Sequence, residues 1–118
     1  MNRRARGAEK ESLAAAYLER QGMQVVMRNY RNRQGEIDII GYHQGYLVFV
    51  EVKYRAGTDK CYAAEAVGIR KQRQVCRVAD YYRLTHHVDS QAGVRYDVVA
   101  IQGGEIHWIR NAFPHVGR

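Results

Sequence analysis

The sequence predicts an α/β fold, a mixed β-sheet flanked by helices, in one domain of residues 1–118. Two apolar runs, 37–42 and 46–52, alternate β-branched and aromatic residues around a glycine-containing turn, which is typical of a β-hairpin. Segments 7–21 and 68–85 have helical spacing. The second is long enough to connect two parallel strands. We therefore expect the order α-β-β-β-α-β with a short terminal strand.

The N-terminal part is expected to form one helix and one strand. Apolar residues recur at helical spacing over 7–21, and Gly22 follows as a stop signal. Residues 24–30 contain a run of β-formers and predict a strand, and 31–35 form a polar turn. Gly35 is the residue expected to permit this turn.

The remaining elements follow the hairpin, which is expected to end near Tyr54. Residues 55–67 have no clear period and predict a loop beside the site. The second helix is expected over 68–85. Residues 94–101 and 105–109 predict the last two strands, joined by a glycine pair.

The hairpin register predicts an acidic pair. If the loop has two residues, His43 pairs with Tyr46 and Asp38 lies directly opposite Glu51. Opposed side chains have Cβ atoms about 4.5–5.5 Å apart, so two carboxylates there repel each other. A hard divalent cation with oxygen ligands would remove that repulsion. We therefore expect Asp38 and Glu51 to bind a metal directly.

The apolar pattern supports this register, because a slip of one residue would move Glu51 to the other face. In this register Glu36 lies opposite Lys53, and the two could form an ion pair. The alternative is an edge hairpin with charged ends in solvent, which explains a glutamate–lysine pair better than an acid–acid pair. The expected faces are Ile37 and Ile39 with Val48, Val50 and Val52, and Ile40 and Tyr42 with Leu47 and Phe49.

Composition is typical of a globular protein that meets a polyanion. The net charge is +7, from 19 basic and 12 acidic residues, and 46% of the residues are hydrophobic. No apolar run is long enough to span a membrane, and no secretory signal is recognised. Cys61 and Cys76 have no metal-site spacing, which suits a reducing cytoplasm.

Several further residues are candidates for the site. Lys53 could stabilise phosphate charge or hold the attacking water, or it could pair with Glu36. Glu11 shares a helix stripe that could face the sheet, and Glu9 is its competitor. Lys71, on the semi-buried face of the second helix, could contact a phosphate or a site carboxylate, or its stem could merely cover apolar surface.

Basic residues on both helices could bind nucleic-acid phosphates or form a solvated face. Arg95 and Asp97 alternate along one strand, and a structural pair is favoured over a catalytic role. The candidate phosphate ligands are Arg70, Arg73 and Arg77, together with Lys71, Arg55 and the N-terminal Arg3, Arg4 and Arg6.

Gly35-Glu36-Ile37-Asp38 followed by residues 48–55 resembles the PD-(D/E)XK nuclease superfamily. More narrowly, the chain resembles the YraN-like family of predicted endonucleases, which are related to archaeal Holliday-junction resolvases. Ile37 stands where the superfamily has its proline, and Lys10 stands where many members have glycine. The resemblance covers most of the chain, through Gly7, Glu11, Ala14, Asn29-Tyr30-Arg31, Lys71, residues 95–99 and Asn111-Ala112-Phe113.

The resemblance implies a restriction-endonuclease-like fold and a metal-dependent DNA endonuclease, with branched or junction DNA as a candidate substrate. It implies Mg²⁺ or Mn²⁺ held by Asp38, Glu51 and the backbone carbonyl of Val52, with Glu11 nearby and Lys53 in catalysis. Resolvase-like nucleases suggest a homodimer by analogy. The alternatives are a nucleic-acid-binding module that keeps the fold without cutting, and a protein-interaction subunit whose basic charge is incidental.

Overall fold

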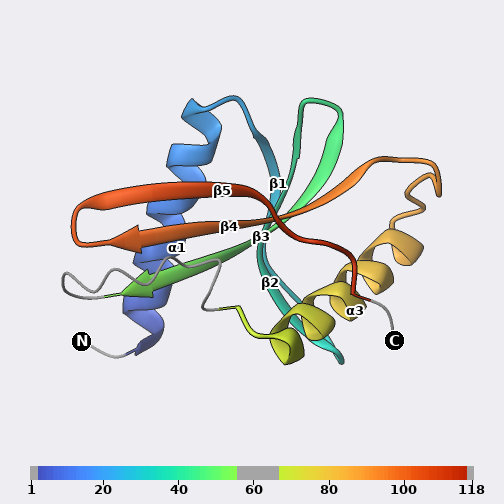
Figure 1. Ribbon diagram of the computed structural model, residues 1–118, viewed down its shortest axis with the longest axis horizontal. Coiled ribbons are helices and arrows are strands. Elements are labelled where there is room, and N and C mark those ends of the chain that lie inside the picture. The colour runs from blue at the N-terminus through green and yellow to red at the C-terminus, as the bar shows by residue number, and fades with distance from the viewer. Residues whose placement is uncertain (1–2, 56–66, 117–118) are drawn as a thin grey trace.

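The computed structural model describes the backbone of residues 3–55 and 67–116, and the side chains of 7–54 and 67–116 (Figure 1). The loop expected over 55–67, with Cys61, therefore lies almost wholly outside the described residues. The side chains of Arg3, Arg4, Arg6 and Arg55 lie outside them as well.

The expected order of elements is confirmed. The main difference is the last strand, which was expected over 105–109 and continues to Phe113. The pairing of the last two strands is irregular between Tyr96 and Val98, and this irregularity lets the strand bend and continue. The elements are α1 (Arg3–Arg20), β1 (Gln24–Asn32), β2 (Gly35–His43), β3 (Tyr46–Arg55), α3 (Ile69–Thr85), β4 (Val94–Gln102) and β5 (Glu105–Phe113).

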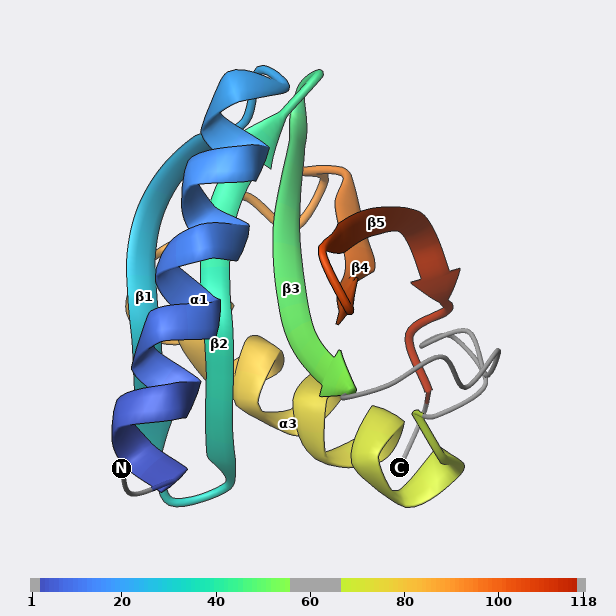
Figure 2. The same ribbon diagram turned by 90° about the vertical axis from the view of Figure 1, so that its left-hand side faces the viewer.

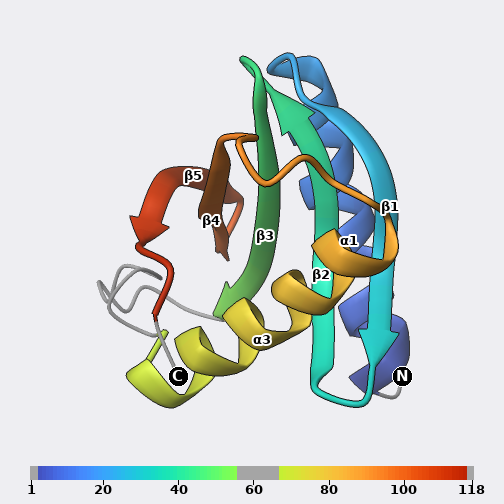
Figure 3. The same ribbon diagram turned by 90° about the vertical axis from the view of Figure 1, so that its right-hand side faces the viewer.

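The five strands form one mixed sheet in the order β1-β2-β3-β4-β5. β3 and β4 are parallel, and the other neighbours are antiparallel. The parallel pair requires a crossover, which α3 provides. Figure 2 and Figure 3 show that α1 and α3 cover opposite faces of the sheet. No described helix is long and apolar enough to cross a membrane.

Each helix buries its own apolar core against the sheet. On the α1 face, small residues such as Ala14 and Ala15 let the helix approach Val48 and Val50 closely. On the α3 face, larger side chains fill the space, and the ring of Tyr82 packs edge-on against Phe49. Both strands of the central hairpin are therefore buried on two faces, which explains their nearly continuous apolar sequences.

The expected face of Ile37 is wrong. Ile37 packs with Ile40 in the core under α3, whereas Ile39 belongs to the core under α1. Strict alternation would place residues 37 and 39 on one face, so the alternation is interrupted at Asp38. The facing strand is irregular at the same level, because Asn29 has a φ of 56° in the left-handed region.

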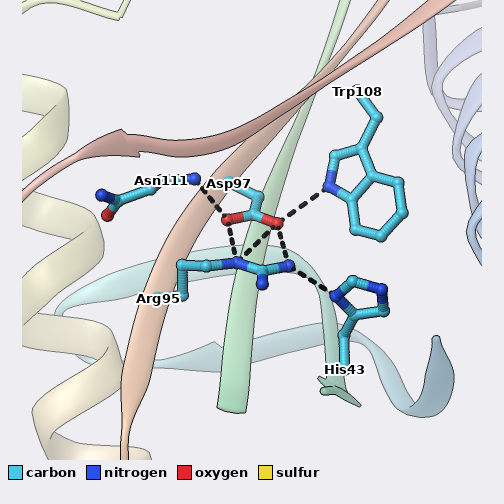
Figure 4. A network of polar contacts seen from close by, with 5 residues as sticks. All are labelled: His43, Arg95, Asp97, Trp108 and Asn111. Atoms are coloured by element: carbon cyan, nitrogen blue, oxygen red, sulfur yellow. Dashed lines mark hydrogen bonds and ion pairs between the residues drawn. The ribbon is translucent and has the colours of Figure 1, made fainter. Parts of the chain in front are cut away.

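A buried polar network ties β4 to β5 and to the tip of the hairpin (Figure 4). Arg95 donates to both oxygens of Asp97, at 2.9 and 2.8 Å. Trp108 Nε1 donates to Asp97 Oδ2 at 2.8 Å, and the Asn111 N–H donates to Oδ1 at 2.9 Å. The expected Arg95–Asp97 pair is thus confirmed, and both its residues are buried.

The network extends to His43, whose Nδ1 accepts from Arg95 Nη2 at 3.0 Å. Burial and the neighbouring Arg95 guanidinium lower the pKa of His43, which favours the neutral ring that can accept this hydrogen bond. Every oxygen of Asp97 has donors, so this carboxylate has a structural role.

Asp97→Ala should lower the free energy of unfolding by about 3–5 kcal/mol, because it leaves the buried Arg95 charge without its partner. Urea unfolding followed by circular dichroism measures this. Asp89→Ala removes an exposed carboxylate whose one hydrogen bond among the described residues is from the Gln91 N–H, so it is the control and should cost far less. Equal losses in the two variants would contradict the structural role of the network.

Candidate active site

The hairpin pairs as expected from its turn up to the edge of the site. The ladder runs from His43–Tyr46 to Ile39–Val50, which confirms the register over this stretch. It stops one pair before Asp38 and Glu51.

Beyond that point an Asp38 side-chain oxygen takes the place of a backbone acceptor, because Oδ2 accepts the Val52 N–H at 2.8 Å. Asp38 therefore lies where β2 and β3 stop pairing.

Glu51 is a buried acid with an incomplete set of partners. It is 4% exposed, and its Oε2 lies 3.8 Å from Lys71 Nζ. Its Oε1 has no hydrogen-bond partner among the described residues. Burial first, and then repulsion from Asp38, raise the pKa of Glu51 to about 8, against the attraction of Lys71 and Lys53.

Asp38 links the acids on the two sides of the sheet. Burial raises its pKa, and the Val52 N–H opposes that shift. Burial also raises the pKa of Glu11, followed by the charge of Asp38, whereas Arg28 lowers it. Asp38 thus makes ionisation less favourable at Glu11 and at Glu51, and a cation beside Asp38 would oppose this effect.

An open cleft of about 1030 Å³ leads to Asp38 from the α1 side. Of the two candidate helix glutamates, Glu11 lines this cleft and Glu9 is exposed outside it. The rest of the cleft is formed by the start of α1, the strands β1 and β2, and the end of β3. Its other lining residues are Gly7, Ala8, Lys10, Arg28, Asn29, Arg31, Glu36, Val52 and Tyr54.

A second hollow of about 580 Å³ lies beside the β1–β2 turn. It is lined by Lys71 and Gln74 of α3 and by residues 31–36. Gly35 makes this close approach possible, because its φ is 143° and an added Cβ would lie 2.7 Å from Gln74 Nε2. Lys71 connects this hollow to Glu51, so of the alternatives for Lys71 the structure shows the contact with a site carboxylate.

The expected Glu36–Lys53 pair is wrong. Glu36 instead accepts from Arg31 Nε at 3.0 Å, because the β1–β2 register places these two residues opposite each other. The β2–β3 ladder ends before it could align Glu36 with Lys53. The charge of Lys53 instead acts on Glu51, whose pKa it lowers.

Among the described residues, no three His, Cys, Asp or Glu side chains are grouped as a metal site. The groups that could hold a metal at this position are Asp38, Glu51 and the backbone oxygen of Val52. Such a set suits Mg²⁺, which is commonly held by one or two carboxylates, with water and substrate phosphates completing the shell.

The arginines of α3 line neither the cleft nor the second hollow. Arg73 and Arg77 line a separate groove of about 400 Å³ with the apolar Tyr81 and Leu84. Arg70 is exposed in the first turn of α3.

Sequence reasoning missed Arg28 and attached no role to Arg31, although both line the cleft. A strict two-residue period would put residues 28 and 31 on opposite faces. The left-handed Asn29 between them changes that, and the sequence offered only an asparagine as a signal.

The family model described as "Uncharacterised protein family UPF0102" matches residues 10–101, more than half of the chain. A UPF0102 protein of Lachnoclostridium phytofermentans is 47% identical over 117 residues, covering 99% of each chain. One of Halorhodospira halophila is 44% identical, covering 93% of this chain and 88% of its own. One of Shewanella sp. strain ANA-3 is 42% identical, covering 91% and 97%. The chain belongs to the UPF0102 family.

Glu51→Gln should change the pH dependence of stability. In the folded protein Glu51 ionises near pH 8, and in the unfolded chain near its ordinary 4.5. Between these values the folded state binds more protons, so this group lowers the free energy of unfolding as pH rises, by up to about 1.4 kcal/mol per pH unit.

The free energy of unfolding of the native protein minus that of Glu51→Gln should therefore fall as pH rises across this window. Urea unfolding in buffers with a chelator measures both values. Glu19→Gln, at an exposed glutamate without an ion pair among the described residues, is the control and should leave the slope across this window unchanged. A Glu51→Gln profile parallel to that of the native protein would contradict the raised pKa.

Proposed function

We propose that this UPF0102 protein is a metal-dependent DNA endonuclease of the PD-(D/E)XK type. The observation that carries the proposal is Glu51 Oε1, a buried carboxylate oxygen without a partner among the described residues, beside a half-buried second acid, Asp38. Burying two like charges is unfavourable unless a cation joins them. The resemblance of the hairpin motif to that superfamily points in the same direction.

The donor set favours Mg²⁺ or Mn²⁺. Asp38, Glu51 and the Val52 carbonyl offer hard oxygens only, which suits these ions better than zinc. When bound, such an ion would activate a water and neutralise charge on a phosphate. Glu11, which already pairs with Arg28 at 3.5 Å, would influence the site through its charge at the cleft mouth.

Two lysines have separate roles in this proposal. Lys71 stabilises the ionised form of Glu51 from the α3 side, at 3.8 Å. Lys53 lies two residues after Glu51 on the same strand and face, so its ammonium can stabilise charge that develops on the scissile phosphate. The hydrogen bond from the Val52 N–H to Asp38 Oδ2 fixes the orientation of the Asp38 carboxylate.

DNA is proposed as the substrate because the chain carries a net charge of +7 despite the acids of the site. Branched or junction DNA, a homodimeric assembly and a cytoplasmic location rest on the sequence resemblance and composition.

Asp38→Ala and Glu51→Ala should each greatly weaken Mn²⁺ binding, because each removes one of the two carboxylate ligands. Isothermal titration with Mn²⁺ measures this. Glu9→Ala removes an exposed acid outside the cleft and is the matched control, with unchanged binding expected. Identical binding by all four proteins would refute the metal site.

Lys53→Ala should lower the rate of DNA cleavage at saturating substrate by about 10²–10³-fold, as expected for a group that acts on charge in the transition state. Its affinity for DNA should fall only slightly. The assay uses linear, single-stranded and four-way-junction DNA with Mg²⁺ and with Mn²⁺, and Arg20→Ala as a surface-charge control.

Cleavage by Lys53→Ala at the native rate would remove Lys53 from the mechanism. If the native protein bound DNA but cut none of these substrates with either metal, a binding module without nuclease activity would replace the proposed function.

A further inference from the structure

Basic side chains from four parts of the fold surround the two hollows of the site. Lys10 of α1 and Arg28 of β1 line the large cleft. Arg33 of the β1–β2 turn and Lys71 of α3 line the second hollow. Arg31 lines both hollows, so the row of cations continues from one hollow to the other.

The two β1 arginines are held in place and still reach solvent. Arg28 Nη2 donates to Ser12 Oγ at 2.9 Å, and Arg28 Nε lies 3.5 Å from a Glu11 oxygen. Arg31 Nε donates to Glu36 at 3.0 Å. The Arg28 and Arg31 side chains are 40% and 61% exposed. A guanidinium has five N–H donors, so these contacts leave donors on each for an anion.

Arg28 and Arg31 offset the repulsion between the acids of the cleft and a polyanion. A polyanion that approaches Asp38 through the cleft also meets Glu11 and Glu36, and all three acids repel it. Arg28 and Arg31 are paired with the latter two acids and lower that repulsion where they lie. Arginine also binds phosphate oxygens through two parallel N–H donors, which fixes a phosphate in position.

We propose that Arg28 and Arg31 are the principal phosphate-binding residues, and that the nucleic-acid backbone runs from the large cleft over the β1–β2 turn to Lys71. This inference rests on the proposed function for its substrate, a nucleic acid, and it adds a path and residues to it. The competing path follows α3. Its Arg73 and Arg77 line the apolar groove with Tyr81 and Leu84, which shares no lining residue with the large cleft.

The test measures binding of a fluorescein-labelled DNA duplex by anisotropy over a series of potassium chloride concentrations, with a chelator present. Metal-dependent cleavage cannot occur there, so the result is independent of whether the protein cuts. The variants are Arg28→Ala with Arg31→Ala, and Arg73→Ala with Arg77→Ala. The control is Arg20→Ala with Arg110→Ala, which removes the same charge outside both hollows.

We expect the β1 pair to lower the slope of log K against log salt by about two units, since each lost phosphate contact accounts for about 0.9. The control pair and the α3 pair should each lower it by much less. Arg28→Lys with Arg31→Lys should retain the native slope, because the point charges remain, while binding weakens through loss of the paired donors.

Three results would overturn the inference. One is a β1 pair with the same slope as the control pair. Another is a larger loss for the α3 pair than for the β1 pair. The third is a lysine double variant whose slope falls as far as that of the alanine variant, because the arginines would then act through the local structure rather than through their charge. None of these results bears on cleavage, which the assay with metal decides separately.

Discussion

The hydrogen bond from the Val52 N–H to Asp38 is the contact on which the arrangement of the site depends. It lies at the end of the β2–β3 ladder, where a backbone carbonyl of β2 would otherwise accept. Because a carboxylate has a second oxygen, the same bond that ends the strand pairing leaves an acceptor at the gap. The negative charge of Asp38 therefore raises the pKa of Glu11, which is on α1, and the pKa of Glu51, which lies near α3.

The sheet contains two buried carboxylates with opposite uses. Asp97 accepts from Arg95, Trp108 and a backbone N–H, so its negative charge is fully compensated. Glu51 has one distant lysine and an oxygen without a partner among the described residues. Burial costs the same kind of free energy at both positions, and only at Asp97 do protein donors offset it. The oxygen of Glu51 without a partner is therefore the feature on which the proposed metal site rests.

Much of this arrangement was predictable from the sequence because it follows from regular periods. The two-residue turn at Gln44-Gly45 fixed the register, and Ile39 opposite Val50 was expected from it. Helical spacing likewise predicted α3 and placed Lys71 on its semi-buried face, where a contact with a site carboxylate was one of two alternatives. These features depend on local patterns that one sequence contains.

The remaining features depend on departures from those periods. Ile37 changes face because the alternation breaks at Asp38, and Asn29 adopts a left-handed conformation on the facing strand. Neither event has a distinctive sequence signal, since asparagine is common in loops and strands with irregularities. Glu36 was assigned to Lys53 for the same reason. A regular hairpin ladder beyond Ile39 would place Glu36 opposite Lys53. The ladder ends at Ile39, and the neighbouring β1 supplies Arg31, which pairs with Glu36.

The left-handed Asn29 of β1 also places the basic side chains of the site near its acids. If β1 alternated strictly, Arg28 and Arg31 would point to opposite faces of the sheet, and only one could line the cleft. With Asn29 left-handed, both line it, one beside Glu11 and the other beside Glu36. Asp38 faces this position across the β1–β2 pair. A break in each of two neighbouring strands thus brings Asp38 and two guanidinium groups to one cleft, which two regular strands could not do.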